Sequence, residues 1–133
     1  MKKVMFTLLG LGAVATGYLQ TAGSTQVAAG KKVYEKNCMA CHMANGNGVP
    51  GLNPPLAKTD WVTGDKKRLI NVVLKGLEDA IEVNGEEYVN PMPAMAHLTD
   101  TEIADVLTYI RASFGNKASA VTSAEVKAIR AKK

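Results

Sequence analysis

The sequence Cys38-Met39-Ala40-Cys41-His42 decides how the rest of the chain is interpreted. It contains both cysteines of the protein and one of its two histidines. The C-x-x-C-H spacing is that of a c-type haem attachment site. Each thiol can form a thioether with a haem vinyl group, and the adjacent imidazole can ligate the iron. We therefore expect Cys38 and Cys41 to hold one covalent haem c, with His42 as the proximal iron ligand.

Three other interpretations of the cysteine pair compete with haem attachment. A thioredoxin-like dithiol would lie in a βαβ pattern, which the sequence does not show. A zinc site would need His42 and His97 as further ligands, at a spacing unusual for zinc. An ordinary disulfide between Cys38 and Cys41 is the third. Haem attachment is favoured because a candidate second axial ligand follows later in the chain.

The N-terminal residues have the pattern of an export signal. Lys2 and Lys3 precede an apolar run over residues 4–19, and small residues follow. A basic region followed by an apolar region is typical of a signal peptide. We predict a signal peptide over residues 1–23, or a membrane anchor if it is not cleaved, and one domain over residues 24–133. Export would place the protein in the periplasm, where unprotected thiols tend to pair.

Length and charge set limits on the class of protein. The chain has 133 residues and a formal net charge of +4. The predicted domain of about 110 residues can form one small core with help from a buried cofactor. Loss of Lys2 and Lys3 with the signal peptide would lower the positive charge further. The charge therefore gives no reason to expect nucleic acid as a partner.

Four segments have apolar residues at helical spacing: residues 25–38, 65–75, 99–114 and 122–131. Thr99 and Thr122 each stand three residues before a glutamate, which is the pattern of a capping box. The alternating segment 81–89 is centred on Asn84-Gly85, a strong signal for a β-hairpin. The sequence therefore predicts an all-α fold of about four helices around one covalent haem, with a short β-hairpin.

A long loop rich in glycine, proline and asparagine follows the cysteine motif, over residues 43–59. A loop of this length in a small domain usually lines a functional site. A carbonyl near Pro54 could accept the second ring N–H of His42 and orient the imidazole. Trp61 follows the loop. Its indole N–H needs a partner if it is buried and could reach a haem propionate, but plain packing of the ring in the core is the favoured interpretation.

Pro91-Met92-Pro93 is the candidate for the distal side of the iron. The two prolines exclude a helix and hold the backbone extended around Met92. A thioether on such a stiff segment suits an axial ligand, although a methionine can also simply fill a core. We predict Met92 as the distal iron ligand. Met95 is the alternative and would otherwise pack on the haem edge, and His97 is a third candidate that we expect to be exposed.

These motifs resemble those of class I, single-haem cytochromes c, over about residues 26–130. The matching elements are Gly30 with Tyr34, CMACH, the PPL and NPMP sequences, and VLTYIRASFGN. The resemblance implies that the N- and C-terminal helices cross, with Gly30 and Tyr34 against Val106 and Tyr109. It also implies Met92 as the distal ligand, and Pro54 or Pro55 as the proline whose carbonyl holds the proximal histidine.

A narrower resemblance comes from LAKTDW, the Asn-Gly hairpin, and TYIRASFGN followed by VTSAEV. These sequences are similar to the cytochrome c domains associated with copper nitrite reductases and periplasmic quinoprotein dehydrogenases. The chain departs from the fused forms because it has no copper-ligand or catalytic domain. Met95 stands where relatives often have an aromatic residue, so it stays a candidate beside Met92.

The resemblance implies a periplasmic one-electron carrier that is not itself an enzyme. An iron with histidine and methionine ligands has no open position for a substrate. We expect a monomer that meets redox proteins in brief encounters, for example a nitrite reductase, a terminal oxidase or a quinoprotein dehydrogenase. The alternative is a haem subunit of a larger membrane or periplasmic oxidoreductase. An enzyme or gas sensor with an open iron position is the third class of function considered.

Lysines could also guide the choice of partner. Lys58, Lys66, Lys67 and Lys75 follow the motif within the same domain. If they surround the haem edge, they would steer an acidic partner toward it. The other interpretation is a solvated charged face, which is the commoner role of such residues.

Overall fold

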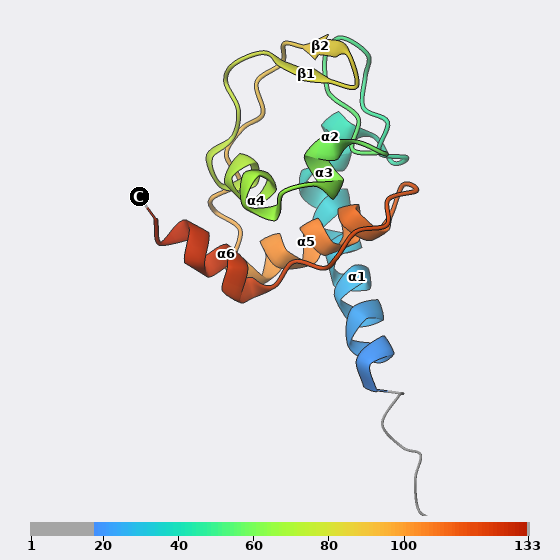
Figure 1. Ribbon diagram of the computed structural model, residues 1–133, viewed down its shortest axis with the longest axis vertical. Coiled ribbons are helices and arrows are strands. Elements are labelled where there is room, and N and C mark those ends of the chain that lie inside the picture. The colour runs from blue at the N-terminus through green and yellow to red at the C-terminus, as the bar shows by residue number, and fades with distance from the viewer. Residues whose placement is uncertain (1–17, 133) are drawn as a thin grey trace, which may run out of the picture.

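The computed structural model describes residues 18–132, so most of the predicted signal peptide lies outside the described residues. This part of the chain forms six helices and one antiparallel two-stranded sheet (Figure 1). The elements are α1 Tyr18–Asn37, α2 Met39–His42, α3 Asp60–Thr63, α4 Lys66–Lys75, β1 Ile81–Val83, β2 Glu86–Tyr88, α5 Asp100–Ala112 and α6 Ser123–Arg130. The predicted fold class is confirmed.

Two of the six helices were not predicted as separate elements. α2 carries the cysteine motif, and α3 carries Trp61; each has only four residues. Thr59 caps α3, because its side chain accepts a hydrogen bond from the Val62 N–H at 3.3 Å. Four residues are too few to show a helical period in the sequence. The four longer helices, α1, α4, α5 and α6, correspond to the four predicted segments.

The core of the fold is the crossing of α1 over α5, which the resemblance implied. A Cβ at Gly30 would overlap the backbone carbonyl of Asp105 and approach the Cβ of Tyr109. The rings of Tyr34, Tyr109 and Phe114 pack against one another with centroids 5.3–5.6 Å apart. The expected pairing of Gly30 and Tyr34 with Tyr109 is present. Val106 is buried in the same core cluster as Tyr34, and the Asp105 carbonyl is the group closest to a Cβ at Gly30.

Two buried polar side chains attach the loops to α5. The Arg111 guanidinium donates to the carbonyls of Val62 at 2.6 Å, Gly64 at 3.2 Å and Ser119 at 2.7 Å. Burial lowers the pKa of Arg111, and these carbonyls replace part of the lost hydration. The segment around α3 is thereby fixed on the helix that packs against α1.

The buried side chain of Asn116 attaches the end of the loop 43–59 to the end of α5. Its side-chain oxygen accepts a hydrogen bond from the Lys58 N–H at 2.7 Å. Its amide nitrogen donates to the carbonyls of Leu56 at 3.0 Å and Ile110 at 2.8 Å. Because a buried backbone group needs a partner, Asn116 determines where the loop 43–59 lies.

The predicted hairpin is confirmed and is longer than its two strands. Asn84 and Gly85 have φ values of 53° and 81°, as a tight turn between antiparallel strands requires. β1 pairs with β2 so that Ile81 faces Tyr88. The bridge between Leu77 and Met92 keeps this same register. The chain from Leu77 to Met92, which we call the long hairpin, therefore carries Met92 at its open end.

The remaining elements close the fold. α6 begins with the predicted capping box at Thr122, and its Arg130 forms an ion pair with Asp100 at 2.7 Å. Within residues 18–132, no helix is both long enough and apolar enough to cross a membrane.

Candidate haem site

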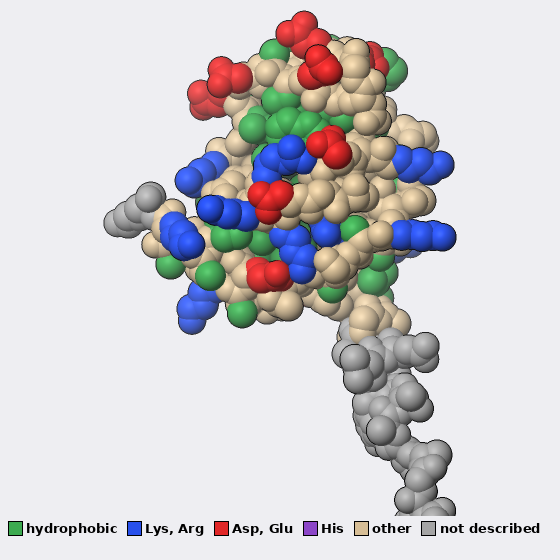
Figure 2. All heavy atoms as spheres, in the orientation of Figure 1, with side chains coloured by type: hydrophobic (Ala, Val, Ile, Leu, Met, Phe, Trp, Pro, Cys, Tyr) green, Lys and Arg blue, Asp and Glu red, His purple; other side chains and the backbone are tan. Residues whose placement is uncertain are grey.

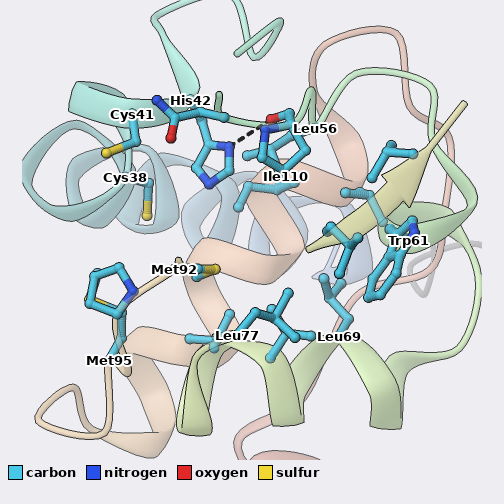
Figure 3. Close-up of a pocket in the computed structure, with 18 of the residues that line it drawn as sticks. Cys38, Cys41, His42, Leu56, Trp61, Leu69, Leu77, Met92, Met95 and Ile110 are labelled. Carbon is cyan, nitrogen blue, oxygen red and sulfur yellow. Dashed lines mark hydrogen bonds between the residues drawn. The ribbon is translucent and has the colours of Figure 1, made fainter. Parts of the chain in front are cut away.

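A cavity lies between α2, the loop 43–59, α4, the long hairpin and α5 (Figure 3). Most of the side chains that line it are apolar, and they come from elements far apart in the sequence. Examples are Leu56, Leu69, Val73, Leu107 and Ile110. The candidate site residues predicted from the sequence, namely Cys38, Cys41, His42, Pro54, Trp61, Met92 and Met95, all line this cavity. A cavity of this lining suits a large, flat and mostly apolar ligand.

His42 is buried, with 8% of its surface exposed. Its Nδ1 lies 2.9 Å from the carbonyl oxygen of Pro54. A carbonyl can only accept, so Nδ1 carries the hydrogen and Nε2 keeps its lone pair. Burial lowers the pKa of His42, which favours the neutral ring that a metal needs. The hydrogen bond expected from Pro54 is thus present, and it fixes the tautomer suited to iron ligation.

The loop that presents Pro54 is held in a tight conformation. Val49 and Asn53 exchange two backbone hydrogen bonds of 2.8 and 2.9 Å. Gly48 has a φ of +63°, and a Cβ there would overlap the carbonyls of Asn53 and Pro54. Only glycine allows these carbonyls to lie so close. The sequence indicated a turn at Gly48 but not this role in positioning Pro54.

The substitution Gly48→Ala tests this positioning. We expect it to lower the free energy of unfolding by about 1–2 kcal/mol more than Gly51→Ala, and to change the reduction potential of the haem-loaded protein. Gly51 is the matched control because it has a similar φ of +69° but no atom within 4 Å of a Cβ. Denaturant unfolding and redox titration provide the two measurements. Equal losses of stability in both variants would show that the cost comes from the positive φ alone and not from contact with the Asn53 and Pro54 carbonyls.

The two cysteines and His42 occupy a single helical turn. Cys38 precedes α2, and the backbone N–H groups of Cys41 and His42 both donate to the Cys38 carbonyl. The thiols form no disulfide. Burial and the neighbouring Cys41 raise the pKa of Cys38 to about 11. Within residues 18–132, no three His, Cys, Asp or Glu side chains are grouped to hold a metal ion, so His97 does not complete a zinc site there.

Met92 enters the cavity from the side opposite His42 (Figure 3). Its backbone is fixed by two hydrogen bonds with Leu77, of 2.8 and 2.9 Å. Gly76, with a φ of +74°, permits this approach because a Cβ there would overlap the Met92 carbonyl. Met95 lines the same cavity, and its N–H donates to the Val73 carbonyl at 2.8 Å.

Comparisons with known proteins agree with this geometry. Residues 27–113 match the sequence profile of the cytochrome c family. The chain belongs to the cytochrome c family. A cytochrome c-552 of Thermus thermophilus is 37% identical over all of this chain and 89% of its own length.

Two further relatives differ in size and role. The cytochrome c subunit of alcohol dehydrogenase (quinone) from Gluconobacter oxydans is 41% identical over 72% of this chain, which matches 20% of that subunit. A cytochrome c6 of Parathermosynechococcus lividus is 39% identical over 63% of this chain and 86% of its own length. The similar proteins therefore include both small cytochromes and a much longer subunit.

The residues of this cytochrome fit a covalent haem c. Two unpaired thiols lie one turn apart, a neutral imidazole faces an apolar cavity, and a thioether lies on the other side. This donor set is that of a haem with histidine and methionine ligands. Together with family membership, it makes the chain a haem-binding electron-transfer protein.

Trp61 lines the cavity and is fixed by its indole N–H and its ring. The indole N–H donates to the Glu82 carbonyl in β1 at 3.1 Å. The guanidinium of Arg68 lies over the ring, 4.5 Å from its centroid. The haem propionate considered as a partner for this N–H stays a prediction. The ring itself lines the cavity.

The four lysines expected at the haem edge do not line the cavity. Among the lining residues only Asp79 is charged. Lys66 is paired with Glu125 of α6 at 3.1 Å. The Lys58 N–H is bound to Asn116, and its side chain lies beside Gly115. The lining thus gives no support to a ring of lysines around this site.

Proposed function

We propose that this cytochrome is a periplasmic one-electron carrier. Its haem c would be bonded to Cys38 and Cys41, with His42 and Met92 as axial ligands. The observation that carries the proposal is that His42 and Met92 enter one apolar cavity from opposite sides (Figure 3). When bound, the haem iron supplies reversible one-electron chemistry, and a methionine ligand raises its reduction potential.

The protein residues have three tasks in this proposal. The Pro54 carbonyl keeps His42 in one tautomer and one orientation. The backbone hydrogen bonds with Leu77 would hold Met92 in place beside the haem. Apolar walls such as Leu69 and Ile110 exclude water and stabilise the less charged state of the iron. With both axial positions taken, the protein has no place for a substrate, so it acts as a carrier and not as an enzyme.

The location and partners follow from the N-terminal pattern and the relatives. The basic and apolar segments within residues 1–23 support export to the periplasm. Partners in this proposal are redox proteins such as a nitrite reductase, a terminal oxidase or a quinoprotein dehydrogenase. A second candidate function is that of a haem subunit in a larger oxidoreductase, supported by the likeness to a dehydrogenase subunit. Copurification with a catalytic protein after export would favour this second candidate.

The visible spectrum of the haem-loaded protein tests the ligand set. We expect a low-spin iron in both redox states and, when oxidised, the weak far-red band of an iron–sulfur bond. Carbon monoxide added to the reduced protein is expected to leave the spectrum unchanged on mixing, because Met92 occupies the sixth position. A high-spin spectrum with immediate carbon monoxide binding would contradict the carrier function and favour an enzyme or sensor.

A further inference from the structure

The charges of this cytochrome are separated along the chain. Residues 76–110 contain eight of the twelve acidic residues and none of the sixteen lysines and arginines. Five of the eight are exposed on the long hairpin: Glu78, Asp79, Glu82, Glu86 and Glu87. On the face shown in Figure 2, acidic side chains gather at the hairpin end, and most lysines and arginines lie around the helices. Although the net charge of the whole chain is positive, the exposed surface of the long hairpin is therefore negative.

The negative end coincides with the mouth of the haem cavity. Leu77, Asp79, Ile81 and Val83 alternate along the first half of the long hairpin, and all four line the cavity, as a side-chain period of two requires. Asp79 both lines the cavity and is exposed, so it lies where the cavity meets solvent. In the register of the hairpin, Asp79 stands opposite Asn90, which also lines the cavity and is exposed.

The carboxylates of this end have no positive partner within the described part of the chain. Glu82 and Glu87 are directly opposite each other in the sheet, an arrangement in which like charges destabilise a strand pair. None of the five hairpin carboxylates forms an ion pair within residues 18–132. Local arrangements that cost stability are expected where function requires them. Positive groups of another molecule would remove this repulsion.

Exposed apolar side chains complete the mouth. Leu52 is 47% exposed and Val89 is 55% exposed. They adjoin Asn53 and Asn90, whose side chains are hydrogen-bonded to each other at 3.3 Å. Leu52 and Val89 are therefore chain neighbours of two residues that line the cavity, so their exposed side chains lie near its mouth. An apolar centre with a charged border is the composition of a protein-docking surface.

We propose that the end of the long hairpin docks a redox partner protein that presents a basic surface. Asp79 lies at the cavity mouth, Glu82 and Glu87 lie on the opposite face of the hairpin, and Leu52 and Val89 are the exposed apolar side chains near the mouth. The proposal rests on the electron-carrier function proposed above and reverses the charge expected from the lysines. The acidic border attracts the basic partner and orients it. The apolar side chains then make the direct contact beside the cavity.

Two small oxidants of opposite charge test the sign of the potential at the mouth. Tris(phenanthroline)cobalt(III) is a cation and ferricyanide is an anion. Each takes one electron from the reduced cytochrome, so that iron(II) becomes iron(III) while cobalt(III) becomes cobalt(II) or ferricyanide becomes ferrocyanide. Without Lys2 and Lys3 the formal charge falls from +4 to +2; a positive net charge would attract the anion, whereas an acidic mouth attracts the cation. We expect the rate with the cobalt complex to fall about tenfold as salt rises, and the rate with ferricyanide to rise.

Matched variants locate the source of the effect. The double substitution Asp79→Asn with Glu82→Gln is expected to remove at least half of the salt dependence with the cobalt complex. Ala124→Lys with Ala128→Lys gives the same change in net charge on exposed positions of α6, and it is expected to leave that dependence within about twofold. The proposal would be overturned if the hairpin variant kept the full salt dependence with the cobalt complex. It would also be overturned if the α6 variant lowered that salt dependence as much as the hairpin variant does.

The failures of the two proposals are distinguishable. A cytochrome that reduces neither oxidant at a measurable rate would contradict the electron-carrier function. A cytochrome that reduces both oxidants, but reacts with ferricyanide faster as salt is lowered, would agree with the carrier function. That result would contradict the proposal that the partner presents a basic surface. An intact visible spectrum in each variant shows that the haem site is preserved.

Discussion

Replacing Met92 with alanine is expected to abolish the far-red iron–sulfur band and to let the reduced iron bind carbon monoxide on mixing. The thioether of Met92 faces His42 across the cavity, and its backbone is fixed by Leu77 (Figure 3). Without this ligand the sixth position opens. The reduction potential is expected to fall, because methionine ligation raises it. Visible spectroscopy and redox titration measure both effects.

Met95→Ala is the matched control for this experiment. Both methionines are partly buried against the same core, so each truncation is expected to lower the free energy of unfolding by about 2–5 kcal/mol. Only Met92→Ala should also change the spin state of the iron. Loss of the far-red band in Met95→Ala, with the band kept in Met92→Ala, would assign the distal ligand to Met95.

Gly30→Ala is expected to lower the free energy of unfolding by about 3 kcal/mol or more. The added Cβ would overlap the Asp105 carbonyl at the crossing of α1 and α5. That carbonyl belongs to helix backbone and cannot move aside by a rotamer change. Denaturant unfolding of the haem-loaded protein, followed by circular dichroism, measures the loss.

The sign of this effect separates packing from helix propensity. Propensity alone would make Gly30→Ala stabilising by about 1 kcal/mol. Ala28 lies two residues earlier on the exposed side of α1. Ala28→Gly is therefore expected to cost about 1 kcal/mol through helix propensity alone. A Gly30→Ala protein as stable as the wild type would mean that α1 and α5 separate at no cost, against the packing described above.

The chemistry of the site was accessible to sequence reasoning because its signals are local. Cys38, Cys41 and His42 lie within one helical turn, and Met92 is marked by the prolines on either side. The hydrogen bond from His42 to the Pro54 carbonyl was also predicted, and it is present. The axial role of Met92 stays a prediction, because Met95 lines the same cavity.

Other features required the folded chain because their partners are distant in sequence. The Lys58 N–H is bound by Asn116, which is 58 residues later. The Trp61 N–H is bound by a carbonyl in β1, and no local pattern distinguishes such a carbonyl from a haem propionate. Whether lysines surround the haem edge likewise depends on the fold. A residue's distance from the cavity depends on packing, not on its position along the chain.

The sequence by itself determined the attachment motif, the helix caps and the turn of the hairpin, because each depends on residues a few positions apart. Thr99, Thr122 and Asn84-Gly85 act in this way through their own backbone neighbours. Only the tertiary structure decided that Gly76 and Leu77 hold Met92, and that Asp79 reaches the mouth of the cavity. These placements depend on which surfaces pack together, since packing brings into contact groups that have no relation along the chain.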